Sequence, residues 1–193
     1  SIKEEEPKIN VTLSPEQKAE LIAMFKSEYA AFEKTHGENF GIYGRLYAVM
    51  ERFDNLFRFP SCKNTAQVCF VTKLMPFFVH VKKIIVYTDQ EFTSEYLSLI
   101  CNAMKEMHNC TDFELFCPES SMDLSPITLC KQLRTLNLVL LKKENDTEGI
   151  GIVIAQLKKL SSLTLNIQFN IANHVVQSIS QLSKLEYLAI HNI

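Results

Sequence analysis

The chain has 193 residues, a formal net charge of −2 and apolar residues at 47% of its positions, values that fit one globular domain. The near-zero charge argues against a dedicated nucleic-acid-binding protein, and the low count of five glycines argues against a glycine-rich nucleotide loop. Residues 81–193 hold 17 of the 22 leucines, whereas residues 1–80 hold 9 of the 13 phenylalanines. We therefore expect two regions that are built on different rules.

The sequence predicts neither a membrane protein nor a secreted one. No uninterrupted apolar stretch reaches the roughly 18 residues of a membrane span. The start at Ser1 lacks the basic and apolar segments of a signal peptide. The six cysteines form no compact framework, so free thiols in a reducing compartment are favoured. We expect an intracellular protein, cytoplasmic or nuclear.

The first region begins with a predicted flexible acidic tail over residues 1–12, where three consecutive glutamates precede a proline. Ser14 and Pro15 then form a typical helix start, with Ser14 as the N-cap and Gln17 at the capping-box position. Apolar residues at helical spacing follow, and Gly37 is a natural helix end. These signals predict a first helix between Pro15 and Gly37.

Two more helices are expected before residue 80, from about 39 to 57 and from about 64 to 78. The first two would form an antiparallel helical hairpin. We interpret residues 13–80 as a helical N-terminal cap, because a stack of repeats must cover the end of its hydrophobic core with an atypical unit.

The helix start allows a second interpretation. Leu13-Ser14-Pro15-Glu16, followed by Leu21-Ile22 and Phe25, resembles the beginning of an F-box, the short helical motif that joins repeat proteins to ubiquitin ligases. The later spacing and the absence of tryptophan depart from that motif. The resemblance implies a substrate receptor of a ubiquitin ligase as an alternative function.

A short template recurs five times from residue 81 onward, with apolar residues at its first, fourth and sixth positions. The starts are separated by 29, 23, 27 and 25 residues, which lies within the range of strand-and-helix repeats. Side chains alternate along a strand, so the fourth and sixth residues should point inward together. The five matches are Val81–Val86, Cys110–Leu115, Leu133–Leu138, Leu160–Leu165 and Leu185–Ile190.

Helical periodicity separates these predicted strands at 92–108, 147–159 and 172–183, and a loop or single turn is expected at 118–130. The pattern resembles the leucine-rich-repeat family in its irregular intracellular form, over about residues 81–193. The resemblance implies an α/β solenoid of about five repeats, with a parallel sheet on the concave side and helices on the convex side.

The sequence departs from the regular form of this family in two ways. The position three residues after the last template residue, where that form has Asn or Cys, holds other residues throughout: Asp89, Pro118, Leu141, Gln168 and Ile193. The last predicted strand also has no polar unit after it. We therefore expect that further repeats or a partner cover this C-terminal edge.

Few residues are arranged for chemistry. His108, Cys110 and Cys117 lie close together in the sequence, but no second ligand pair accompanies them. Cys110 already fills the first template position. A metal site or a cysteine nucleophile therefore has little support, and we expect no catalytic residues, no metal and no cofactor.

The outward template positions are the candidate binding site, on the predicted concave face. Apolar or aromatic residues on such a face often mark partner sites. Coverage by another segment, or β-propensity alone, would also explain them. We expect a non-enzymatic adaptor that binds a protein or peptide through this face or through the helical cap, and keep a nuclear adaptor for RNA or chromatin as an alternative. The candidate residues are Ile85, Tyr87, Phe116, Val139, Leu141, Tyr187 and His191.

Overall fold

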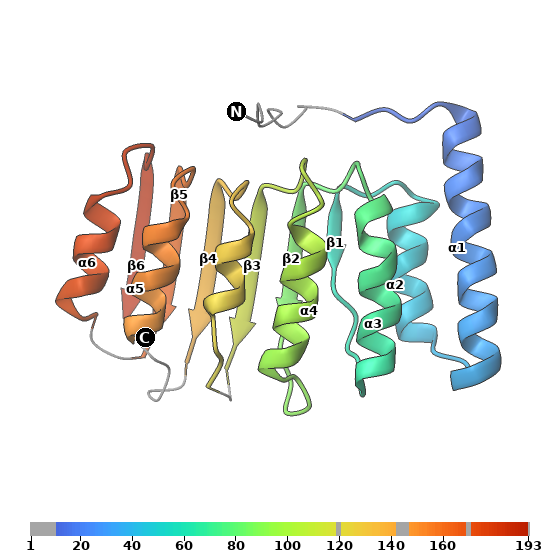
Figure 1. The fold of residues 1–193 in the computed structure, drawn as a ribbon, viewed down its shortest axis with the longest axis horizontal. Coiled ribbons are helices and arrows are strands. Elements are labelled where there is room, and N and C mark those ends of the chain that lie inside the picture. The colour runs from blue at the N-terminus through green and yellow to red at the C-terminus, as the bar shows by residue number, and fades with distance from the viewer. Residues whose placement is uncertain (1–10, 119–120, 142–146, 169–170, 193) are drawn as a thin grey trace.

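The computed structural model describes residues 11–118, 121–141, 147–168 and 171–192 (Figure 1). Within these residues the protein is α/β, with one six-stranded parallel sheet whose strands follow chain order. The predicted acidic tail falls mostly on residues 1–10, outside the described residues. The strands are β1 (Leu56–Arg58), β2 (Lys83–Tyr87), β3 (Asp112–Cys117), β4 (Thr135–Leu140), β5 (Ser162–Ile167) and β6 (Tyr187–Asn192).

Helices alternate with these strands along most of the chain. They lie over one face of the sheet, with α1 beyond the β1 end (Figure 1). None of the described helices combines the length and apolar character that crossing a bilayer requires. The helices are α1 (Pro15–His36), α2 (Phe40–Met50), α3 (Thr65–Leu74), α4 (Ser94–Met104), α5 (Thr147–Gln156) and α6 (Asn173–Ser180), with the 3₁₀ turns η1 (Met75–Phe77) and η2 (Ser125–Leu129).

The template predicts β2 to β6 correctly, and its second position explains how the strands are joined. At every junction one carbonyl accepts hydrogen bonds from two consecutive N–H groups of the next unit, at 2.8–3.2 Å. Successive units are therefore stacked with the same register, and both N–H groups at each of these junctions have a hydrogen-bond partner. The five accepting residues are Asn55, Lys82, Thr111, Arg134 and Ser161.

One face of the sheet forms the core. Residues alternate between buried and partly exposed along β3, β4 and β5, as expected for a sheet covered on one side. The residue two positions after the template, such as Leu140, is buried as well. The fourth and sixth template residues of β2 to β5 are at most 1% exposed: Ile84, Val86, Phe113, Leu115, Leu136, Leu138, Leu163 and Leu165.

The N-terminal helices begin where their capping residues predict. Ser14 accepts a hydrogen bond from the Gln17 N–H at 3.1 Å, and the Gln17 side chain accepts one from the Ser14 N–H at 2.9 Å. Helix α1 ends at Gly37, whose positive φ of 78° suits glycine. Aromatic rings pack between α1, α2 and α3. Phe32 of α1 stacks on Phe70 of α3, with 4.3 Å between the ring centroids.

The predicted helix over 39–57 is wrong beyond Met50. The chain turns at Phe53, which has a positive φ of 58°, and then forms strand β1. This strand follows the same template, with Phe57 and Phe59 at the fourth and sixth positions, but Asp54 replaces the apolar first residue. The sheet therefore begins inside the region expected to be helical, and β1 pairs directly with β2. The third expected helix is present as α3 followed by η1.

The last strand differs from the others. Leu188 and Ile190 occupy the inward template positions of β6, yet they are 45% and 41% exposed. Their exposure follows from their place at the edge of the sheet, because in the described residues no further unit lies beyond β6 to cover them.

Candidate binding surface

The face of the sheet opposite the helices is formed by the third, fifth and seventh template residues. We call it the open face. In β3, β4 and β5 all nine of these side chains are partly exposed. Because adjacent strands pair position to position, these side chains form continuous rows across the sheet. The row of seventh positions runs Tyr87, Phe116, Val139, Asn166 and His191.

Two aromatic rings begin this row. Tyr87 is 53% exposed, and its ring lies 5.5 Å from that of Phe116, tilted by 52°. Val139 follows on the next strand and is partly exposed. The structure thus brings three of the predicted site residues together, as one apolar strip on the open face. Paired aromatic rings with an exposed edge are favoured anchors for a partner.

Ile85 does not contribute to this strip, because its side chain is only 6% exposed. Its partners in register are Arg58 on β1 and Glu114 on β3. Glu114 also forms an ion pair with Lys83 at 3.2 Å, two residues before Ile85 on β2. The prediction that Ile85 is exposed is therefore wrong, and we attribute its burial to these long flanking side chains.

The other predicted residues lie apart. Tyr187 is 57% exposed, but it belongs to the row of third positions on β6, four strands from β2. His191 is exposed at the far end of the Tyr87 row, with Asn166 between it and Val139. Leu141 lies just after β4 and is partly exposed; its N–H donates to the Cys117 carbonyl at 3.3 Å. The seven candidates thus do not form a single cluster.

The polar part of the open face is of mixed charge. The Lys83–Glu114 ion pair lies beside Asp112, which pairs in register with Lys83. In β4, Asn137 holds its Oδ1 atom buried without a hydrogen-bond partner in the described residues. The strands β4 and β5 place threonine, serine and asparagine at the remaining outward positions. This composition suits hydrogen bonding to a polar backbone more than binding to phosphates.

Five of the six cysteines are packed as core residues, and Cys69 is exposed. Burial raises the pKa of the Cys110 thiol, and it raises that of Cys62 to about 12, with the Asp89 carboxylate adding to the shift. The pKa of the Cys101 thiol is raised mainly by a hydrogen bond with Cys130, and burial raises it further. Thiols in such environments are poor nucleophiles at neutral pH. Among the described residues, no group of three or more potential metal-ligating side chains comes together.

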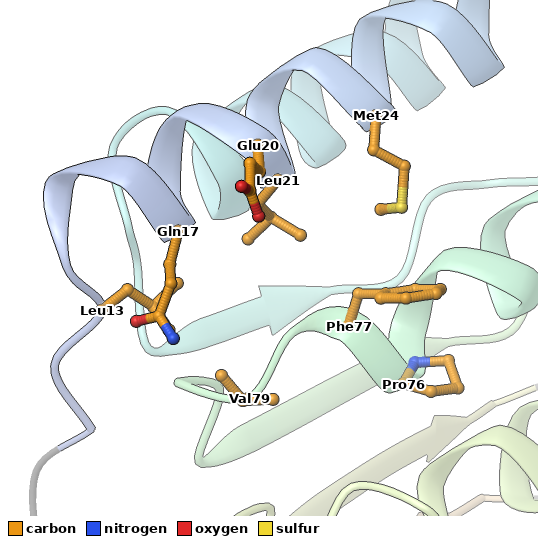
Figure 2. Close-up of a pocket in the computed structure, with 8 residues that line it drawn as sticks. All are labelled: Leu13, Gln17, Glu20, Leu21, Met24, Pro76, Phe77 and Val79. Atoms are coloured by element: carbon orange, nitrogen blue, oxygen red, sulfur yellow. The ribbon is translucent and has the colours of Figure 1, made fainter.

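A groove lies between α1 and η1, apart from the open face (Figure 2). It is a groove of about 430 Å³ with a mainly apolar lining. Met24 reaches from α1 toward Phe77, and Val79 lies on the same side of the groove as Phe77, facing Leu13 and Gln17 (Figure 2). Phe77 is 49% exposed and Val79 is 39% exposed. The lining residues are Leu13, Gln17, Glu20, Leu21, Met24, Pro76, Phe77 and Val79.

Sequence reasoning did not single out Phe77 and Val79. The signal was present as a run of apolar residues around Pro76, but periodicity alone does not separate the buried Phe78 from its exposed neighbours. Comparisons of the chain with protein-family models, with curated proteins and with solved structures each found no match.

Proposed function

We propose that this protein is a non-enzymatic adaptor, a solenoid of the leucine-rich-repeat type that binds an extended protein segment on the open face of its sheet. The observation that carries the proposal is the pair of the exposed Tyr87 and the partly exposed Phe116, which continues into Val139. The two rings stabilise the sheet by their contact across the strands, but that contact leaves Tyr87 53% exposed. An occupant that covers the exposed part of this pair would add the free energy of burying its apolar surface.

The stacking of the units supports the solenoid part of this proposal. At all five junctions between described strands, one carbonyl accepts hydrogen bonds from two consecutive N–H groups of the next unit. One side of the sheet is covered by helices and the other is open. Repeat proteins with this layout present the open face as an extended binding surface. The helices α1 and α2 beyond β1 would then act as the terminal cap.

The chemistry of the open face suggests the kind of partner. The apolar strip would receive one or two large apolar side chains, while the neighbouring Asn, Thr and Ser residues would bond to peptide groups. The alternative of an RNA or chromatin adaptor predicts binding that falls steeply with salt. A gel-shift titration with no retardation at low salt would eliminate that alternative.

The test replaces the two rings together, Tyr87→Ser and Phe116→Ser, and compares proteins captured by the variant and by the wild type with quantitative mass spectrometry. A matched control is Ile152→Ser, which removes an apolar side chain of similar exposure, 55%, on the helix side. We expect specific partners to be lost only from the double variant, with unchanged thermal unfolding. Binding is then measured by titration with the purified partner.

The proposal fails if the double variant retains every partner that the wild type captures specifically. It also fails if the helix-side control loses those partners equally.

The groove between α1 and η1 supports a second candidate, in which the helical end docks onto a ubiquitin-ligase component. Leu13 and Leu21, from the segment that resembles an F-box, line this groove, whereas Phe25 is fully buried. Phe77→Ser with Val79→Ser should then abolish capture of that partner, while the Tyr87 and Phe116 variant retains it. The opposite pattern assigns binding to the open face.

A further inference from the structure

The turns that lead from a helix or 3₁₀ turn into the next strand have the same form from β2 to β6. In each of them the N–H group of the first template residue donates to the carbonyl of the residue three positions earlier, at 2.9–3.2 Å. The two residues between this donor and acceptor form the tip, as Lys131 and Gln132 do before β4. Because the strands are parallel, these tips lie along one edge of the sheet, the edge at which α1 begins (Figure 1).

Basic residues occupy these turns before β4 and β5. Lys131 holds the first tip position before β4, and Lys158 and Lys159 hold both tip positions before β5. Arg134 comes just after its tip and directly precedes the open face of β4. Neither of the two turns contains an Asp or Glu residue. We define Lys131, Arg134, Lys158 and Lys159 as the basic edge.

Three cations of the basic edge have no acidic partner among the described residues. Lys131, Arg134 and Lys158 are exposed, and none of them forms an ion pair there. The Lys131 Nζ atom instead donates to the Oε1 atom of Gln156, a neutral side chain of the next unit, at 3.2 Å. Like charges on adjacent turns repel one another, so this arrangement opposes folding. An acidic ligand would remove that repulsion.

The helix dipoles do not account for these charges. A positive side chain is favourable in the last turn of an α-helix, and the effect decreases beyond that turn. Helices α4, α5 and α6 have no basic residue in their last turns. The unit of β4 has only the 3₁₀ turn η2 in place of an α-helix, yet it supplies Lys131 and Arg134. The charges therefore indicate a ligand rather than stabilisation of a helix end.

The net charge of −2 is a sum over two different edges. The opposite edge of the sheet, where strands end and helices begin, carries the exposed carboxylates of Asp89, Glu91, Glu95 and Asp123. A chain with almost no net charge thus presents a positive surface at one edge. That surface attracts an acidic group over about 8 Å, the Debye length at physiological ionic strength.

The basic edge is continuous with the open face along β4. After Arg134 the outward residues of this strand are Thr135, Asn137 and Val139, and Val139 belongs to the apolar strip. Arg134 and Val139 lie about 17 Å apart at the usual rise of a strand. Asn137 is partly exposed, and turning its amide over would present the unpaired Oδ1 atom to a peptide N–H group. One path therefore leads from positive charge through neutral hydrogen-bonding groups to the apolar strip.

We propose that the segment bound on the open face carries a cluster of Asp or Glu residues about five to seven positions from its apolar anchor. The anchor lies on the apolar strip and the acidic cluster on the basic edge. This inference rests on the proposed function and adds the charge and spacing of the partner. Single-stranded nucleic acid is disfavoured, because the turns of the basic edge hold no Phe, Tyr or Trp on which a base could stack.

The first test selects peptides from a phage-displayed library of random sequences, long enough to span both surfaces, against the 193-residue protein. We expect the recovered peptides to share a large apolar residue and an acidic cluster at the proposed spacing. Selection on a variant without three cations of the basic edge should keep the apolar residue and lose the acidic cluster. This variant is Lys131→Gln with Arg134→Gln and Lys158→Gln.

The second test titrates one recovered peptide in solution. The triple variant should bind it roughly tenfold more weakly at low salt, because three exposed ion pairs are lost. The difference should shrink as salt is added. A matched control removes three exposed cations away from the basic edge and has the same net charge, so it should bind like the wild type. The control is Lys34→Gln with Arg45→Gln and Lys63→Gln.

The peptide supplies the reciprocal change. Replacing its acidic residues with Asn and Gln should weaken binding to the wild type and abolish the difference between the wild type and the triple variant. A persistent difference would show that the cations act through the fold and would overturn the inference. Thermal unfolding of both variants checks that they are folded.

The remaining outcomes separate this inference from the proposed function. Recovered peptides that require Tyr87 and Phe116 but lack acidic residues, or that bind the triple variant as tightly as the wild type, overturn the inference and leave the proposed function intact. Recovery of no peptide that requires the two rings contradicts the proposed function, and the inference with it. A single-stranded RNA that displaces the peptide and itself requires the basic edge assigns that edge to nucleic acid and overturns the inference.

Discussion

The N-terminal third of the chain and the units from β2 onward form their hydrophobic cores from different side chains. Around α1, α2 and α3, Phe25, Tyr29 and Tyr43 make irregular ring contacts at 4.9–6.3 Å between centroids. In the units from β2 onward, aliphatic residues stack at equivalent positions on successive strands. The aromatic contacts occur once, between α1, α2 and α3, whereas the aliphatic contacts recur from strand to strand. This difference indicates that a few aromatic residues provide most of the stability of the N-terminal third, and that many equivalent residues share it in the units from β2 onward.

The largest effect is expected at the aromatic end. Phe25 is fully buried, and Phe25→Ala should lower the free energy of unfolding by about 4 kcal/mol. Hydrogen exchange should increase in α1, α2 and β1 and leave β4 and β5 protected. Denaturant titration with exchange measurements tests both points, and Phe40→Ala, at a side chain 78% exposed, is the control. Equal loss of protection along the whole sheet would contradict a locally concentrated cluster.

A similar truncation of an aliphatic core residue should destabilise the units on both sides of the substituted strand. Leu138 is fully buried in β4, and Leu138→Ala should cost about 3 kcal/mol. Exchange should rise in β3, β4 and β5, because each unit packs mainly on the adjacent ones. Val139→Ala, at the next residue on the open face, should cost clearly less. If hydrogen exchange increases only within β4, the packing of one unit does not stabilise the adjacent units, and the prediction is contradicted.

A smaller, pH-dependent effect is expected at the boundary between the two regions. His80 is buried, stacked on Phe53 at 3.8 Å, and its Nε2 atom lies 2.9 Å from the Val49 carbonyl oxygen. Burial lowers the pKa of His80, and the Lys18 charge lowers it further, against the opposing effect of the Val49 and Asp54 contacts.

The unfolded chain therefore takes up this proton before the folded one does. The free energy of unfolding should fall as pH decreases through about 6.5. It should stop falling once the pH is below the lower pKa of folded His80. Denaturant titrations over this range should show a shallower dependence of the free energy of unfolding on pH for His80→Phe than for the wild type. An unchanged slope in His80→Phe would show that other groups control the acid response.

The smallest effects distinguish how tightly the helices are packed in each region. Gly44 lies inside α2, and an added Cβ would meet no atom within 4 Å, so Gly44→Ala should stabilise the protein by about 0.5–1 kcal/mol. Gly151 lies inside α5, where the same change meets His174 at 2.8 Å. Gly151→Ala should therefore gain nothing or lose stability in a thermal melt. Equal gains would mean that α5 and α6 can move apart freely.

The sequence predicts most of the sheet because three apolar positions per unit are enough to define a strand. Strand β1 was missed for a specific reason: Asp54 stands at its first position, and the residues before it continue a helical period. Phe53, with its left-handed backbone, ends that period in a way that residue type does not indicate. Exposure on the open face was harder to predict. Tyr87 and Ile85 occupy equivalent outward sites, yet neighbours on other strands bury one and leave the other free.

The distribution of the thiols has a practical consequence. Five buried cysteines, from Cys62 to Cys130, extend through the helices and strands that lead to β4, and Cys69 alone is exposed. In a Cys69→Ser background, a thiol reagent would modify the folded protein only when one of these segments opens. Mapping the modified cysteines over time would give an opening rate for each unit up to β4. Strands β5 and β6 carry no cysteine, so thiol modification would not detect local opening of these two strands.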